Sequence, residues 1–262
     1  MKNQPGRLKI RFLAGCLLFS LLCLSVAGAA ENPFRGVLMQ GFGWNSTNNG
    51  VPGKWYALVG ERAQDMADLG ITMIWLPPVS RSVSPQGYLP GDYYDLGTPQ
   101  SPTFYGDKDQ LAQCIKNLHA AGIKVIADIV VNHRCAGQQD ANGIWNIFHF
   151  PSNKASWEQW AVCRGEYGGT GNGDSGDNYQ AAPDVDHTNS KVQEDIVEWM
   201  KWLKGLGFDG WRYDFVKGYA GDYVGLYDSK TAPYFSVGEL WTDMSFNGSY
   251  LNLNQNPHRQ KL

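Results

Sequence analysis

The chain has 262 residues, 43% of them hydrophobic, and a formal net charge of −3 at pH 7. A chain of this length can build its own apolar core, and its charge gives no reason to expect nucleic acid or an anionic membrane as a partner. Its five cysteines are too few for a disulfide scaffold.

The N-terminus has the pattern of a secretory signal. Basic residues up to Arg11 precede an apolar run over 12–24, which is short for a membrane span, and small residues follow as far as Ala29 and Ala30. Residues 1–30 are therefore predicted to be a signal peptide, and the mature protein to be secreted, either extracellular or periplasmic. An uncleaved membrane anchor is the alternative.

Beyond the signal, short apolar runs typical of strands alternate with helical patterns. Helices are predicted over 54–69, from the N-cap Asp107 to Gly122, and from Ser190 to Gly205. Such repeated βα units imply a parallel sheet. Strands are predicted over residues 35–42, 71–76, 124–131, 208–215 and 234–240.

Polar, charged or aromatic residues stand at nearly every predicted strand end, which favours a barrel over a doubly wound sheet. The fold class is thus α/β, a TIM-type (β/α)8 barrel of which about five βα units are present. Five strands cannot close a barrel, so two open sheet edges are expected. Residues 31–262 would form this truncated catalytic barrel. The irregular stretch 133–187, rich in Gly, Asn and Asp, would be a loop domain inserted after the third strand.

Two predicted strands end in carboxylates with contrasting surroundings. Arg212 lies two positions before Asp214 on the same strand face, so its guanidinium is expected to keep Asp214 ionised. Glu239 has no such partner in the local sequence, and its apolar neighbours favour a raised pKa. Two acids whose surroundings shift their pKa values in opposite directions suggest a nucleophile and a proton donor, which is the chemistry of a retaining glycosidase.

Three motifs occur in a fixed order along the chain: Asp128-x-x-x-Asn132-His133, Gly210-x-Arg212-x-Asp214-x-x-Lys217 and Gly238-Glu239-Leu240-Trp241. They resemble three signature regions of the α-amylase family of glycoside hydrolases. Segments 39–44, 87–90 and 182–187 resemble more closely the plant-type α-amylases and their bacterial relatives. The resemblance covers essentially the whole mature chain.

The resemblance implies the roles of individual residues. Asp214 would be the nucleophile, Glu239 the general acid and base, and Arg212 the support that orients Asp214. The substrate would be starch or a maltooligosaccharide, cleaved at internal α-1,4-glucosidic bonds with retention of configuration. The enzyme would act as a monomer, without nucleic acid and, once the signal is removed, without a membrane. Residues that bind the substrate would be Tyr88, His133, Lys217 and Trp241.

The resemblance also implies a Ca²⁺ ion that joins the loop domain to the barrel, and hard oxygen donors on a flexible loop suit this ion. Without the resemblance, turn chemistry would be the preferred interpretation of these Asx residues. Asn178 stands where the plant-type group has an aspartate, which argues against further calcium sites. The implied ligands are the side chains of Asn132, Asp174 and Asp184 and the main-chain oxygens of Asp177 and Gly218.

The family's fourth signature, a strand that ends in Asn-His-Asp, does not occur in this sequence. Hydrogen bonds that strengthen in the transition state, such as those its aspartate makes, contribute several kcal/mol. We therefore expect the chain to be the N-terminal portion of a longer amylase and to be inactive alone. The alternatives are a truncated, non-catalytic α-glucan-binding protein and an oligosaccharide-forming exo-amylase or transglycosylase.

Overall fold

The computed structural model describes residues 36–47, 53–240 and 246–251. The predicted signal peptide and Trp241 lie outside the described residues. Among those described, no helix is long and apolar enough to cross a bilayer.

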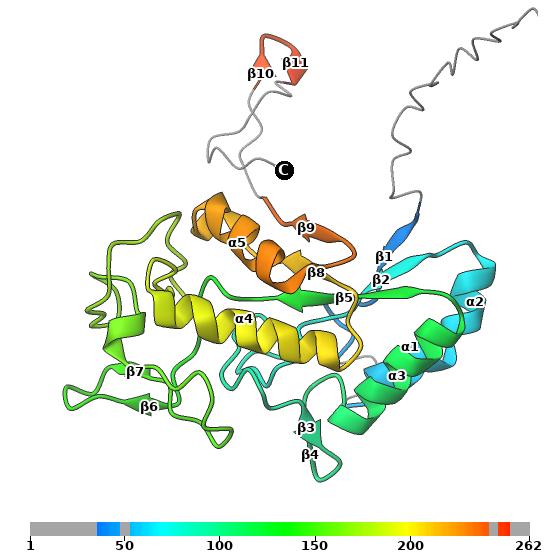
Figure 1. Cartoon of the computed structure of the whole chain (residues 1–262), viewed down its shortest axis with the longest axis horizontal. Coiled ribbons are helices and arrows are strands. Elements are labelled where there is room, and N and C mark those ends of the chain that lie inside the picture. The colour runs from blue at the N-terminus through cyan, green and yellow to red at the C-terminus, as the bar shows by residue number, and fades with distance from the viewer. Residues whose placement is uncertain (1–35, 48–52, 241–245, 252–262) are drawn as a thin grey trace, which may run out of the picture. The chain divides into compact units, whose positions relative to one another are not determined.

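One curled parallel sheet organises the chain, as predicted (Figure 1). Its strand order, β1-β2-β5-β8-β9, follows the chain, which is the order of a (β/α) barrel. Central strand β5 is buried along almost its whole length, which explains why its sequence is apolar at nearly every position. The strands are β1 (Leu38–Gln40), β2 (Met73–Trp75), β5 (Lys124–Ile129), β8 (Gly210–Tyr213) and β9 (Ser236–Gly238).

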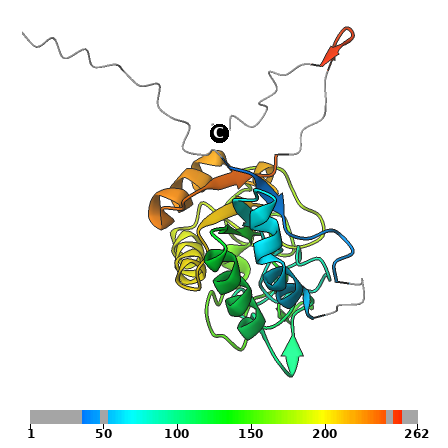
Figure 2. The ribbon, with the colours of Figure 1, turned by 90° about the vertical axis from the view of Figure 1, so that its right-hand side faces the viewer.

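Helices follow one another along the outside of this sheet (Figure 2). The apolar stripes predicted for α3 and α4 are buried in the core, as expected for amphipathic helices. Asp107 caps α3 by accepting from the backbone N–H groups of Asp109 and Gln110, which confirms its predicted role. The cap of α4 is Asn189, one residue before the predicted start. The helices are α1 (Trp55–Glu61), α2 (Ala63–Asp68), α3 (Lys108–Ala120), α4 (Ser190–Gly205) and α5 (Gly221–Thr231).

Two helical features differ from the prediction. The helix expected over 54–69 is broken at Arg62, whose ψ of 5° leaves the helical region and separates α1 from α2. Helix α5 was not predicted, because it contains two glycines and buries only Tyr227 and Thr231. Its sequence therefore lacks the apolar stripe that reveals the other helices.

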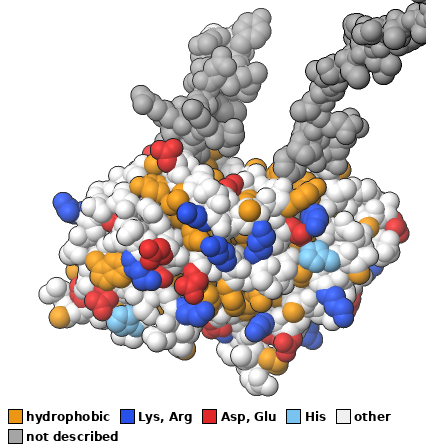
Figure 3. All heavy atoms as spheres, viewed as in Figure 1, with side chains coloured by type: hydrophobic (Ala, Val, Ile, Leu, Met, Phe, Trp, Pro, Cys, Tyr) orange, Lys and Arg blue, Asp and Glu red, His pale blue; other side chains and the backbone are white. Residues whose placement is uncertain are grey.

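The segment 133–187 is mostly irregular and lies beyond the carboxyl ends of β5 and β8 (Figure 1). Two of its large apolar side chains, Phe148 and Trp157, are fully buried in the common core, whereas Trp145 is exposed. On the face drawn in Figure 3, basic and acidic side chains are interspersed. The short elements are β3 (Gly97–Thr98), β4 (Ser101–Pro102), β6 (Gln138–Gln139), β7 (Trp145–Ile147), η1 (Gln159–Ala161), η2 (Val216–Gly218), β10 (Phe246–Asn247) and β11 (Tyr250–Leu251).

Candidate active site

Arg212 is the centre of a cluster of acids at the carboxyl edge of the sheet. Its Nη1 lies 2.8 Å from Asp128 Oδ1 and 2.8 Å from Asp214 Oδ1. Its Nη2 lies 2.7 Å from Glu239 Oε1. Asp128 and Asp214 are buried, whereas the Glu239 side chain is 28% exposed. One guanidinium therefore holds three carboxylates, and the most accessible of them is Glu239.

Strand pairing brings these residues together. Asp128 on β5 is the register partner of Arg212 on β8, so the two side chains stand next to each other on neighbouring strands. The Asp214 N–H donates to Ile129 O at 3.0 Å, and the Glu239 N–H donates to Tyr213 O at 2.9 Å. Both acids are thus fixed by main-chain bonds just past their strands, where barrel enzymes carry their catalytic groups.

The electrostatics of the cluster correct the sequence-based expectation. Burial, followed by the negative charge of Asp128, raises the pKa of Asp214 well above its usual range despite the opposing effect of Arg212. Burial likewise raises the pKa of Asp128 to about 6. The prediction that Arg212 keeps Asp214 ionised was wrong, because Asp214 is buried and shares this cation with two other carboxylates. Glu239 has no charged partner in the local sequence, but folding brings Arg212 to it.

Tyr88 links the loop after β2 to this cluster. Its hydroxyl donates to Asp128 Oδ2 at 2.9 Å, and the indole Nε1 of Trp75 donates to the same oxygen at 2.9 Å. The ring of Trp44, which is 66% exposed, is stacked parallel to the Tyr88 ring at 6.3 Å. Two parallel aromatic rings therefore stand beside the acids, an arrangement on which sugar rings can stack.

His133 is hydrogen-bonded to the main chain of Tyr88. Its Nε2 bonds Tyr88 O at 2.8 Å, and a carbonyl can only accept, so Nε2 carries a proton. Burial lowers the pKa of His133 to about 4, which keeps the ring neutral at pH 7. Tyr179 covers the other face of the ring at 3.7 Å. The structure thus places His133 next to the Tyr88 main chain, with its Nε2 already bonded to the protein.

Lys217 was predicted to bind substrate and lies on η2. Its Nζ is 3.5 Å from Asp177 Oδ2 and 5.2 Å from the centre of the Phe215 ring. Phe215 has a φ of 45°, a left-handed conformation that is strained for a bulky residue, directly after Asp214. Its N–H points to Glu239 Oε2 at 3.4 Å. The sharp turn after β8 therefore places the main chain that follows Asp214 next to the Glu239 carboxylate.

The residues implied as calcium ligands meet at the junction of the loop segment and the barrel. Asn132 Nδ2 donates to Asp184 Oδ1 at 3.0 Å. Asn132 Oδ1 and Asp174 Oδ2 are buried and have no hydrogen-bond partner among the described residues. The Gly218 backbone approaches closely, because a Cβ atom there would lie 2.0 Å from Asn132 Oδ1. Neighbouring oxygen atoms that accept no hydrogen bond suit a hard cation such as Ca²⁺.

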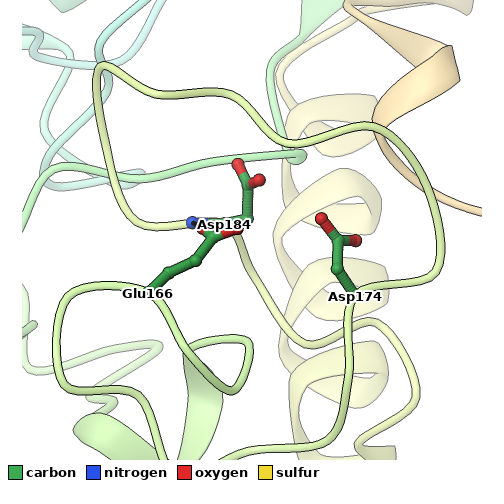
Figure 4. A group of neighbouring side chains, drawn as sticks. All are labelled: Glu166, Asp174 and Asp184. Carbon is green, nitrogen blue, oxygen red and sulfur yellow. Dashed lines mark hydrogen bonds between the residues drawn. The ribbon is translucent and has the colours of Figure 1, made fainter.

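A further acid, Glu166, belongs to the same region and was not predicted from the sequence. Glu166 and Asp174 approach Asp184 from opposite sides (Figure 4), and their carboxylate oxygens lie within 4.8 Å of one another. Burial raises the pKa of Asp184 to about 8, and the charges of Glu166 and Asp174 add to the effect. A divalent cation would relieve this repulsion, so the residues present fit Ca²⁺. Asn178, which stands where the plant-type group has an aspartate, hydrogen-bonds Glu166.

Together, acids grouped at the carboxyl edge of a parallel β/α sheet define a barrel-type hydrolase site. Residues 43–236 match the family model described as alpha amylase, catalytic domain. The chain therefore belongs to the α-amylase family, and the resemblance to plant-type and bacterial members is confirmed.

The relatives align with most of this chain, but this chain spans only part of their length. It is 43% identical to "Alpha-amylase 3, chloroplastic" of Arabidopsis thaliana, over 86% of this chain and 25% of that protein. It is 36% identical to "Probable alpha-amylase 2" of the same plant, over 87% of this chain and 52% of that protein. The solved α-amylase of Malbranchea cinnamomea shares the fold, with a TM-score of 0.55 and 20% identity, over 78% of this chain and 45% of that one.

Proposed function

We propose that the protein carrying this chain is an α-amylase that cleaves internal α-1,4-glucosidic bonds of starch and related α-glucans with retention of configuration. The observation that carries this proposal is that the Arg212 guanidinium binds Asp214 through one terminal nitrogen and Glu239 through the other. Two carboxyl groups on one guanidinium are close together, which favours the spacing of about 5–5.5 Å in retaining enzymes over the wider inverting spacing.

The chemistry follows from this arrangement. A carboxylate oxygen of Asp214 attacks the anomeric carbon of the bound sugar, while Glu239 donates a proton to the glycosidic oxygen that leaves. Glu239 then accepts a proton from water, and the water oxygen attacks the same carbon and releases Asp214. Two displacements restore the original configuration. In the free cluster the pKa of Asp214 is raised well above its usual range, so the first step requires the proton of the pair to reside on Glu239 and Asp214 to be ionised.

Aromatic side chains and Lys217 would hold the glucan. The stacked rings of Trp44 and Tyr88 offer apolar faces to successive sugars. His133 orients the Tyr88 main chain through its Nε2 bond, and this is its part in substrate binding. Lys217 would contact the sugar on the leaving side, and Trp241 would lie near it.

Hydrolysis of maltoheptaose tests the proposal. Proton NMR should show α-configured reducing ends appearing first, and products of several lengths should appear together, because cleavage is internal. A single product length would favour an exo-amylase, and transfer to added acceptor sugars would favour a transglycosylase. Binding without any reducing ends would instead favour a glucan-binding protein. Because the chain spans only part of its relatives, the assay is run on this chain and on any longer protein that carries it.

We also propose that Ca²⁺ binds at the loop junction through Asn132, Asp174, Asp184 and the main chain of Asp177 and Gly218, with Glu166 as an additional ligand. The support is the unpartnered oxygens and the crowded carboxylates. When bound, the ion would join segment 133–187 to the sheet and so stabilise the loops around the acids.

Chelation should therefore lower the melting temperature. Free Ca²⁺ at about 100 times its Kd stabilises a protein by about 2.7 kcal/mol, and EDTA should remove this amount. Differential scanning fluorimetry measures the shift with and without Ca²⁺. Asp174→Asn should abolish the shift, whereas the exposed Asp222→Asn, on α5, should keep it. An equal shift in both variants would place the ion elsewhere.

We propose in addition that the protein is exported, that its first 30 residues are removed, and that it then acts as a monomer. The support is the basic, apolar and small-residue order of the N-terminus. N-terminal sequencing of protein recovered from outside the cytoplasm should begin near Glu31. Recovery of an intact Met1 terminus would contradict export by cleavage.

A further inference from the structure

Arg134 is a fully buried cation next to the site in sequence and outside it in space. Its side chain is 0% exposed, and none of the salt bridges found among the described residues involves it. Nε donates to Gly91 O and Nη1 donates to Ala155 O, both at 2.7 Å. Nη2 has no partner within the described part of the chain. A buried charge is costly unless its surroundings compensate for it, so its placement calls for a reason.

Aromatic rings provide the compensation. The guanidinium carbon lies 4.4 Å from the centre of the Tyr93 ring and 4.8 Å from that of Trp157. Phe150 and Phe148 follow at 5.0 and 5.4 Å. The faces of such rings attract a cation, most strongly where water is excluded. Burial lowers the pKa of Arg134 to about 10, so the group stays charged at neutral pH.

The partners of Arg134 belong to two separate parts of the chain. Gly91 and Tyr93 lie in the loop after β2, which also carries Tyr88. Ala155 and Trp157 lie in the segment 133–187. The side chain is therefore a rigid link between the loop segment and the loop that presents Tyr88 to the acids.

Two further bonds run beside this link. His133 Nε2 bonds Tyr88 O at 2.8 Å, and the Cys135 N–H donates to Pro90 O at 2.8 Å. Three consecutive residues, 133–135, are thus each bonded to the stretch 88–91. Arg134 also hydrogen-bonds to the loop segment through its side chain, at Ala155 O, whereas His133 contacts that segment by stacking on Tyr179.

We propose that Arg134 is a positioning residue for the sugar-binding aromatic pair: by clamping 88–91 to the loop segment, it fixes Tyr88 and hence the stacking surface it forms with Trp44. The inference rests on the proposed α-glucan activity. It assigns Arg134 no contact with substrate. If Arg134 only stabilised the fold, its loss would affect Tyr88 and glucan binding no more than any core mutation that lowers stability by the same amount.

The experiment compares Arg134→Met with Leu203→Ala, a fully buried core substitution in the last turn of α4. Hydrogen exchange read by mass spectrometry reports the opening of residues 87–91, and titration with maltoheptaose reports affinity. We expect Arg134→Met to speed exchange in 87–91 and to weaken maltoheptaose binding, each by about tenfold, as for the loss of one charge-assisted hydrogen bond. Leu203→Ala should change neither by more than about twofold when its loss of stability is similar.

Arg134→Lys provides the graded test. Lysine keeps the charge among the rings but lacks the fork that reaches two carbonyl groups, so its values should fall between those of the wild type and Arg134→Met. It also serves if Arg134→Met does not fold. Unchanged exchange in 87–91, or equal changes in Leu203→Ala, would overturn the proposal. If the wild type neither binds nor cleaves maltoheptaose, the proposed activity fails, while the exchange measurement still decides the role of Arg134.

Discussion

Glu239→Gln should slow maltoheptaose hydrolysis by about 10²–10⁴-fold, the usual contribution of a general acid and base. Binding should remain within a few-fold, because the amide keeps the shape of the side chain and its place beside Arg212. Initial rates and a titration with maltoheptaose measure the two effects. The exposed Glu61→Gln, at the end of α1, is the matched control and should behave as the wild type.

A substrate with a leaving group that needs no proton separates the two acids. With maltosyl fluoride, Glu239→Gln should still form the ester at Asp214 but hydrolyse it slowly, so mass spectrometry should find maltose attached to the peptide that contains Asp214. Azide, which needs no general base, should release it as the α-azide. Asp214→Asn should form no ester. A labelled peptide elsewhere in the chain would show that another residue is the nucleophile.

Arg212→Met should lower the free energy of unfolding by about 3–5 kcal/mol at neutral pH, because it leaves three carboxylates without their buried cation. The exposed pair formed by Arg62 and Asp65 provides the control. Arg62→Met should change stability by less than about 1 kcal/mol. Urea titration measures both variants.

The loss in Arg212→Met should depend on pH in a defined direction. The folded-state pKa of Asp128, about 6, lies above its unfolded value. The stability linked to this group is therefore full below the unfolded pKa and is lost as pH rises through 6. Removing the cation raises the folded pKa values further, so the deficit should be largest at neutral pH and should shrink as the pH falls to about 3, where most carboxyls are protonated in both states. A deficit that grows on acidification would contradict this account.

Local patterns in the sequence determined much of the fold. The alternation of apolar runs and helical stripes predicted the five parallel strands and helices α3 and α4, because buried faces need apolar residues at fixed spacing. Helix α5 escaped prediction because most of its surface is not buried, so packing had imposed no stripe on its sequence. The break at Arg62 comes two residues after Gly60, which is a weak signal because a single glycine inside a helical pattern is tolerated.

The sequence by itself also singled out Asp214, Glu239 and Arg212, because strand-end acids in family motifs are local features of the chain. Only the tertiary structure decided how they interact. Asp128 lies 84 residues from Arg212 in sequence but 2.8 Å away in space. Burial, followed by the charge of Asp128, reverses the expected shift in the pKa of Asp214. The cluster of Glu166 with Asp174 and Asp184 also forms only on folding. The same holds for the hydrogen bonds of Arg134 to Gly91 and Ala155. A pKa and a buried contact depend on which groups are near in space and on how far water is excluded, and neither quantity is written in the local sequence.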